Sequence, residues 1–262
     1  MAKNDRIDSF KIANLMRGGN FPLAYVYPKE MRATRDLLRR RTKLVRHGAH
    51  LKVHFSNTTS QYNLPTHKVN LKNVSAREHL KTAFPDRVVQ RNIGLDMAVL
   101  DCYAKELSKI ECFLEQQAKQ HNPVHWHLLK SISGIGRILG LTIIYEIGHI
   151  DRFESVQKFA SYARLVKCKA ESAGKSYGTQ GNKIGNAHLK WAFSEAAVLF
   201  LRGNDKAQKY LLKLQRRMSK AKALSVLAHK LGRCVYFMLK NEKVFDESRF
   251  LKSYSRNGVS WK

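Results

Sequence analysis

Acidic residues are scarce in this chain of 262 residues, because 20 aspartates and glutamates stand against 48 lysines and arginines and leave a net charge of +28. A folded core does not need such an excess. Its physical consequence is an attraction to polyanions that weakens as salt is added. The basic residues are spread along the whole chain. We therefore expect a cationic body that binds nucleic acid, and we rank an anionic membrane surface second.

Other common features are missing as well. No run of about 18 apolar residues and no charged-then-apolar leader is present, so we expect a soluble, cytoplasmic protein with no membrane partner. The four cysteines show no C-x-x-C spacing, which excludes a zinc ribbon and indicates reduced thiols. The sequence also lacks a Walker loop and a dinucleotide fingerprint. These absences exclude several large classes of enzyme.

Two long segments repeat apolar residues every seven positions. One runs from Glu30 to about Phe55 and the other from about Arg87 to His121. The repeats are Leu37, Leu44 and Leu51 in the first segment and Ile93, Leu100, Leu107 and Leu114 in the second. This spacing predicts two helices that pack either as an αα-hairpin or as a coiled coil between subunits. The polar stretch between them, Ser56 to Asp86, is expected to be a loop or hairpin tip.

The first of these helices carries more arginine than solubility requires. Asp36 is the only acidic residue inside it, so a simple solvated face is the weaker interpretation. We expect contact with nucleic acid from four of its residues: Arg35, Arg39, Arg40 and Arg46.

From Trp126 onward the pattern is helical and richer in glycine. Leu128 to Gly148 indicates a helix-hairpin-helix unit, in which Gly134 and Gly136 would let backbone N–H groups meet phosphate. Four further helices are expected, at about Phe153–Ala163, Asn186–Leu201, Asp205–Met218 and Lys220–Leu239. The predicted fold class is therefore mainly α.

A loop rich in glycine and lysine separates the first two of those helices. It contains Ser172, a candidate nucleophile. The alternative is a simple turn with no catalytic role, which is what most loops of this composition are. Glycines allow a close approach to phosphate and lysines neutralise it. The candidate contacts here are Lys169, Lys175, Lys183, Asn186 and Lys190.

Two carboxylates lie one helical turn apart near the start of the chain. Asp5 and Asp8 suit either a shared Mg²⁺ or the N-terminus of a helix, and the residues alone leave this choice open. The histidine pairs His50/His54 and His125/His127 lack a third ligand nearby, which argues against a metal site there.

Together, these segments resemble one family. The chain is similar to insertion-sequence transposases that join an N-terminal RuvC-like DEDD domain to a C-terminal serine-bearing domain, a group with Piv-like invertases and bridge-RNA-guided recombinases. Lys3 to Ala13 looks like the K-x-D-x-x-D-A motif of that family. The C-terminal motifs follow in order in five segments: Ser133–Gly136, Ile147–Phe153, Lys158–Ala163, Ser172–Gly174 and Gly185–Lys190.

The resemblance implies a concrete chemistry and organisation. Ser172 would attack a phosphodiester and form a covalent link to DNA, and Asp5 and Asp8 would be two of four Mg²⁺ ligands. Implied partners are DNA, a structured non-coding RNA and further subunits in a dimer or tetramer, in the nucleoid of a bacterial cytoplasm. The implied divisions are a remnant of the RuvC-like α/β domain (1–28, its last helix), a basic coiled-coil region (29–122) and the serine-bearing domain (123–262).

The chain departs from the family in two places. The first aspartate and the glutamate of the tetrad lie upstream of the K-x-D-x-x-D motif in the family, and two of the four carboxylates are therefore missing here. Ala173 replaces the usual glycine after the serine. We expect a truncated DNA transposase or recombinase; the alternative is a nucleic-acid-binding remnant that no longer cleaves. An unrelated helix-hairpin-helix scaffold is a third interpretation, and activity itself is left open.

Overall fold

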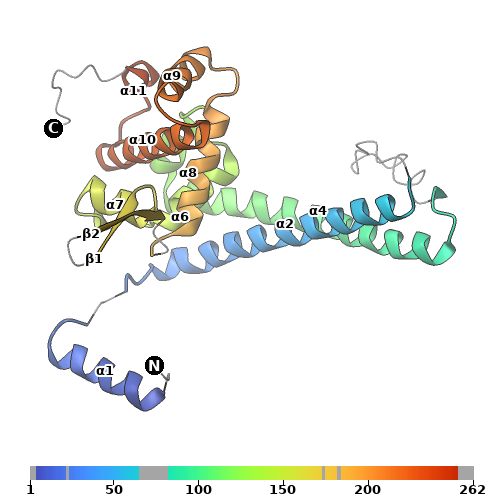
Figure 1. The fold of residues 1–262 in the computed structure, drawn as a ribbon, viewed down its shortest axis with the longest axis horizontal. Coiled ribbons are helices and arrows are strands. Elements are labelled where there is room, and N and C mark those ends of the chain that lie inside the picture. Colours follow the sequence, from blue (N-terminus) through green and yellow to red (C-terminus); the bar gives the residue numbers. More distant parts are fainter. Residues whose placement is uncertain (1–3, 22–23, 65–81, 173–174, 182–183, 253–262) are drawn as a thin grey trace.

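The computed structural model describes residues 4–21, 24–64, 82–172, 175–181 and 184–252, and this part of the chain is mainly helical, as the sequence predicts (Figure 1). The elements in chain order are α1 (Asp5–Arg17), α2 (Lys29–Gln61), α4 (Arg87–His121), α5 (Pro123–Lys130), α6 (Arg137–Ile147), the 3-10 turn η1 (Ile150–Arg152), α7 (Val156–Tyr162), β1 (Lys167–Ser172), β2 (Lys175–Gly181), α8 (Ala187–Phe200), α9 (Asp205–Gln215), α10 (Lys220–Asn241) and α11 (Glu247–Leu251). Along the described residues, no helix has both the length and the apolar character needed to cross a membrane.

α2 and α4 pack side by side in opposite directions and form an arm that extends from a helical body (Figure 1). Leu38 and Phe55 are buried in α2, whereas the heptad leucines of α2 are only half-buried. In α4 the heptad residues Ile93 and Leu114 are fully buried. Gly48 is buried between the two helices, where an added Cβ would make an ordinary van der Waals contact of 3.5 Å with Leu100 Cδ2. The arm is thus an intrachain helix pair whose base belongs to the core of the body, through Met31, Leu38, Leu114 and Ala118.

The sequence predicts that a loop begins at Ser56, but in the structure α2 continues to Gln61. Thr58 and Thr59 are buried there, and their hydroxyls donate to the carbonyls of His54 and Ser56. Because the helix itself satisfies these polar groups, a polar sequence can remain helical. Phe55 also packs in a cluster at the tip of the arm with Phe84, Ile93 and Met97.

The body is built around α6, in which every residue from Leu139 to Ile147 is buried. α8 packs on α6 and α10 packs on α8. The turn between α5 and α6 lies against the end of α8: Gly134 has φ +89°, and an added Cβ would lie 2.5 Å from the backbone nitrogen of Phe200. Its glycine is thus needed for packing. The predicted helix at Phe153–Ala163 is shorter than expected, because Ser155 caps α7.

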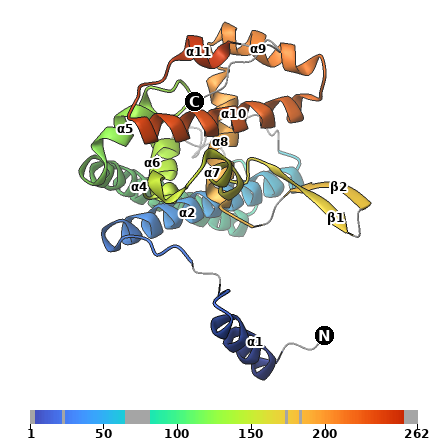
Figure 2. The same ribbon diagram turned by 90° about the vertical axis from the view of Figure 1, so that its left-hand side faces the viewer.

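A β-hairpin replaces the loop predicted around Ser172. β1 and β2 are antiparallel, with Lys167 opposite Gly181 at the base and Ser172 opposite Lys175 near the tip. The hairpin projects from the body between α7 and α8 (Figure 2). The segment has few apolar residues and hence no alternating apolar pattern that would predict strands. The two strands are held together by backbone hydrogen bonds, which leave no such pattern in the sequence.

α1 lies apart from the body and has no buried residue (Figure 1). Its apolar side chains are open to solvent, with Phe10 68% and Met16 64% exposed. Asn4, rather than an aspartate, caps the helix by accepting from the Arg6 N–H, and Gly18 ends it. Asp5 and Asp8 lie in the first turn, where negative charge suits the helix dipole.

Candidate nucleic-acid interface

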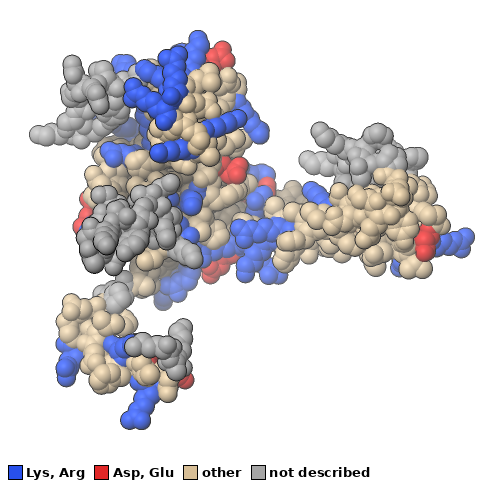
Figure 3. All heavy atoms as spheres, in the orientation of Figure 1, with Lys and Arg blue, Asp and Glu red and all other residues tan. Residues whose placement is uncertain are grey.

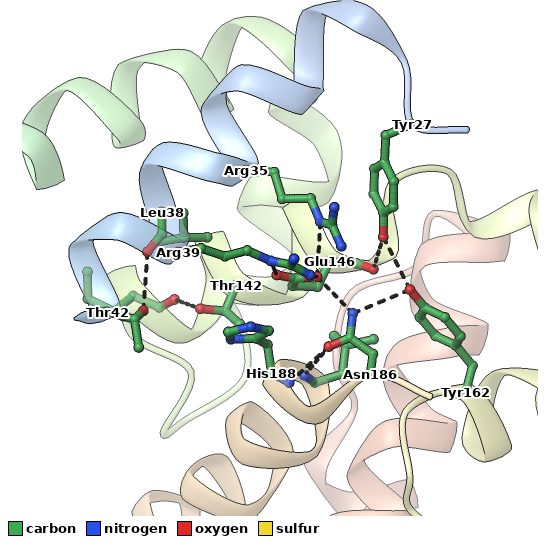
Figure 4. A network of polar contacts seen from close by, with 12 residues as sticks. Tyr27, Arg35, Leu38, Arg39, Thr42, Thr142, Glu146, Tyr162, Asn186 and His188 are labelled. Atoms are coloured by element: carbon green, nitrogen blue, oxygen red, sulfur yellow. Dashed lines mark hydrogen bonds and ion pairs between the residues drawn. The ribbon is translucent and has the colours of Figure 1, made fainter. Parts of the chain in front are cut away.

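A buried carboxylate joins the arm to the body. The side chain of Glu146 on α6 is 1% exposed and receives hydrogen bonds from three side chains (Figure 4). Arg35 Nε lies 3.1 Å from Oε2, and Arg39 binds both carboxylate oxygens through Nε at 2.7 Å and Nη2 at 2.8 Å. The third donor is Asn186 Nδ2, 2.7 Å from Oε2. We call Glu146 and these three partners the Glu146 node.

The node holds its carboxylate in the charged form. Burial alone would raise the pKa of Glu146, but the hydrogen bonds from Arg39 and Asn186 and the charges of both arginines outweigh it and lower that pKa. The same bond raises the pKa of Arg39. A buried charge with several charge-assisted bonds fixes the geometry of its partners. The first turns of α2 are therefore locked onto α6.

Asn186 extends the node to the base of the β-hairpin. Its side-chain oxygen accepts from the N–H groups of His188 and Leu189 and caps α8. Its backbone N–H donates to the Tyr162 carbonyl at 2.6 Å. Tyr27, in the connector before α2, donates from its hydroxyl to the Glu146 carbonyl at 2.8 Å. The two ends of the 163–185 segment are thus held together beside Glu146.

A basic groove lies next to the Glu146 node, between the arm and the start of α8. Its volume is about 460 Å³, and it is lined by Asp36, Arg39, Arg40, Thr42, Lys43, Arg46 and His188. Four lining residues are cationic and one is acidic. Arg40, Lys43 and Arg46 are exposed, whereas Arg39 is 35% exposed and already bound to Glu146. In Figure 3, lysines and arginines gather where α2 leaves the body. We call this cavity the arm groove.

His188 gives the arm groove a titratable group. Burial lowers its pKa, Glu146 acts in the opposite direction, and the charges of Arg39, Arg46 and Arg35 lower it further. The imidazole is therefore neutral at pH 7 and can gain a proton when an anion enters. Sequence reasoning missed this residue as a site residue, because only the fold brings the start of α8 beside α2.

The structure brings together part of the predicted site. Arg39, Arg40 and Arg46 share the arm groove, with Asn186 directly beneath. Arg35 is 14% exposed, and its guanidinium stacks on the Tyr27 ring at 3.8 Å. Lys43 is a further groove cation that the sequence analysis left out of the site.

The remaining predicted contacts lie elsewhere. Gly136 is the N-cap of α6 with open space around it, and Lys190 is exposed on α8. The side chains of Ser172, Lys169 and Lys175 lie outside the described part of the structure, as does all of Lys183. The backbone places Ser172 five residues along β1 from the hairpin base, a distance of about 17 Å.

The carboxylates on α1 do not by themselves fit a Mg²⁺ ion. Asp5 is exposed and Asp8 is half-buried. Across the described residues, no group of three or more histidine, cysteine, aspartate or glutamate side chains is placed to hold a metal. Two carboxylates on one helical turn leave most coordination positions of a hard cation to water. We therefore assign no chemical step to a metal.

Comparison with known proteins adds one finding. Residues 126–212 match the family model described as Transposase IS116/IS110/IS902 family. The matched segment runs from α5 into α9 and so includes the β-hairpin and the start of α8. No curated protein matches the chain. The family match supports an insertion-sequence transposase, and hence DNA as a partner.

Proposed function

We propose that this chain is a DNA transposase of an insertion sequence, which holds the phosphate backbone in the arm groove and cleaves and joins strands through Ser172. The family match over residues 126–212 carries the proposal, because it covers the segment that bears Ser172, Asn186 and Lys190. The arm groove adds a physical reason. Exposed Arg40, Lys43 and Arg46 offer positive charge to a phosphodiester at a place that the Glu146 node keeps rigid.

In the proposed reaction, Ser172 Oγ attacks a backbone phosphorus. A new P–O bond forms as the serine proton is lost to a base, and the P–O bond to one strand end breaks, so that the released sugar oxygen takes up a proton. Joining is the reverse step, with the hydroxyl of another strand end as the nucleophile. Lys169 and Lys175 are close in sequence and would neutralise charge that develops on the phosphoryl oxygens.

Two partners belong to the same proposal. A structured non-coding RNA and further copies of the chain, as a dimer or tetramer, are implied by the resemblance, and the net charge of +28 supports a large polyanionic partner. Gly134 and Gly136 would place a second backbone contact at the turn before α6. The described residues supply only Asp5 and Asp8 toward a Mg²⁺ site, so the metal would need ligands from elsewhere.

A second candidate function is nucleic-acid binding without cleavage. The observation that favours it is the isolated carboxylate pair on α1, which completes no metal site within the described residues. In that case the arm groove would still bind DNA, whereas Ser172 would be an ordinary hairpin residue.

A denaturing gel tests the proposal. Purified protein is mixed with labelled DNA carrying the element ends, the flanking RNA transcript and Mg²⁺, and the gel is scored for DNA that migrates with protein. The transposase proposal predicts a protein-linked band that Ser172→Ala abolishes. The matched control is Ser176→Ala, which changes a serine on the neighbouring strand and should leave the band intact.

A parallel filter-binding assay on the same samples separates the two candidates. DNA binding by all three proteins without any linked band would establish the binding protein and reject the transposase. A band that survives in Ser172→Ala would reject Ser172 as the nucleophile.

A further inference from the structure

A second basic surface lies on α9 and the start of α10. Residues 205–222 hold seven lysines and arginines and one acidic residue, Asp205. All seven cationic side chains are exposed: Lys206, Lys209, Lys213, Arg216, Arg217, Lys220 and Lys222. We call this surface the α9 face, and Figure 3 shows lysines and arginines gathered over this part of the body.

Helical spacing puts the cations of α9 on one side. Ala207 and Leu211 are buried toward the body. Lys206, Lys209 and Arg216 follow the outer side at positions i, i+3 and i+10, and span about 15 Å along the helix axis. This is a row of charges long enough to meet several phosphates of one strand, which are about 3.4 Å apart along the duplex axis.

Three of the seven cations on the α9 face have no neutralising carboxylate among the described residues. On other helices, exposed lysines pair with a carboxylate one turn away, as Lys109 does with Glu106 and Lys119 with Glu115. In the part of the chain that the structure describes, Lys206, Lys209 and Arg216 take part in no ion pair. A solvated surface that serves only solubility normally mixes both signs of charge. The α9 face therefore favours an external polyanion.

The α9 face and the arm groove lie on opposite sides of the body. Figures 1 and 2 show α9 at one side and α2 at the other, with α6, α8 and α10 between them. α8 bridges the two sides: its first turn lines the arm groove, and its last turn leads into α9. Its 14 residues span about 21 Å. A straight duplex that lies along one surface does not reach the other.

We propose that the α9 face binds the backbone of a second duplex DNA segment, so that one protein holds two nucleic-acid segments at once. This inference rests on the nucleic-acid function proposed above for the arm groove. A duplex suits the surface better than a single strand, because single-strand sites present exposed rings for base stacking. The only aromatic residue of 205–222 is Tyr210, and it is half-buried, with Lys230 Nζ 4.4 Å from its ring centroid.

A bridging assay tests the inference. A biotinylated 40-mer duplex is fixed on beads, the full-length protein is added, and capture of a second, fluorescent duplex is measured. The variant Lys206→Gln/Lys209→Gln/Arg216→Gln should still bind the fixed duplex but capture the second one at least about tenfold less, because three phosphate contacts are lost. The control removes three exposed cations from the arm, through Arg87→Gln/Arg91→Gln/Lys105→Gln, and should capture normally.

The outcomes distinguish this inference from the proposed function. Normal capture by the α9 variant would overturn the inference and leave the arm groove untouched. Equal capture of a fluorescent single strand by the wild-type protein would overturn the preference for duplex. Wild-type protein that holds the fixed duplex and captures no second one would also overturn it, whereas failure to bind any duplex would reject the proposed function itself.

Discussion

Replacing Glu146 with alanine removes the carboxylate on which the arm, α6 and the cap of α8 converge. Three donors then lose their acceptor. Arg35, at 14% exposure, and Asn186, at 6%, have little access to water, whereas Arg39 at 35% can turn toward solvent. Removing one partner of a buried ion pair costs about 3–5 kcal/mol. Because Arg39 can be rehydrated, we expect the lower end, about 3 kcal/mol of unfolding free energy.

Chemical denaturation monitored by circular dichroism measures this loss. The matched control is Glu115→Ala, since Glu115 also contacts two cations, Lys119 and Arg137, but its side chain is 26% exposed and the two partners are 54% and 44% exposed. Water can replace the lost contacts there, so that change should cost about 1 kcal/mol or less. In a thermal scan the two variants should differ by several degrees. Equal losses for Glu146→Ala and Glu115→Ala would refute the view that the Glu146 node locks the arm.

The same variant carries a pH signature. The pKa of Glu146 is lower in the folded protein than in the unfolded chain, so its stabilising contribution is present above the unfolded value of about 4.3. That contribution is lost as the pH falls through the folded pKa. The stability difference between wild type and Glu146→Ala should therefore be constant from about pH 6 to 8 and shrink below about pH 4.

Three further outcomes are expected. DNA affinity should rise as the pH falls from 8 to 6, because phosphate in the arm groove favours protonated His188, and His188→Asn should weaken this dependence in titrations by fluorescence anisotropy. Gly134→Ala should lower the unfolding free energy by about 2 kcal/mol or more, because Gly134 has a positive φ and the added Cβ would clash with the backbone of α8. Gly136→Ala is the control: its Cβ would enter open space, and its unfolding free energy should stay within about 1 kcal/mol of wild type. Burial raises the pKa of Cys234 to about 11, so iodoacetamide at pH 8 should modify it far more slowly than exposed Cys102, as followed by mass spectrometry; equal rates would contradict the burial of that thiol.

Helical parts of this fold can be predicted from sequence because their signals are local. α4 has the predicted bounds. The starts of the next two predicted helices are also correct, because Asn186 is the N-cap of α8 and Asp205 is the first residue of α9. The hairpin around Ser172 was missed, since its residues carry no alternating apolar pattern. The end of α2 was missed because buried threonines look polar in sequence yet bond to their own helix.

The candidate site depends on contacts between residues far apart in the chain. Glu146 is conspicuous within an apolar run, which marks it as a buried charge, but its arginine partners lie 107 and 111 residues earlier. The sequence indicates an arginine-rich face on α2 without saying which side chains are free. The structure separates Arg35, enclosed by Tyr27 and Glu146, from Arg40 and Arg46, which remain open in the arm groove.

The measurement that tests the arm groove most directly is the salt dependence of duplex binding by Arg40→Gln/Lys43→Gln/Arg46→Gln, set beside the α4 control Arg87→Gln/Arg91→Gln/Lys105→Gln. Each phosphate contact contributes about 0.9 to the slope of log affinity against log salt. If the three groove cations each meet a phosphate, the slope should become shallower by about 2.7 in the groove variant and stay close to wild type in the control. A groove variant with the affinity and slope of the control would show that DNA does not bind in the arm groove.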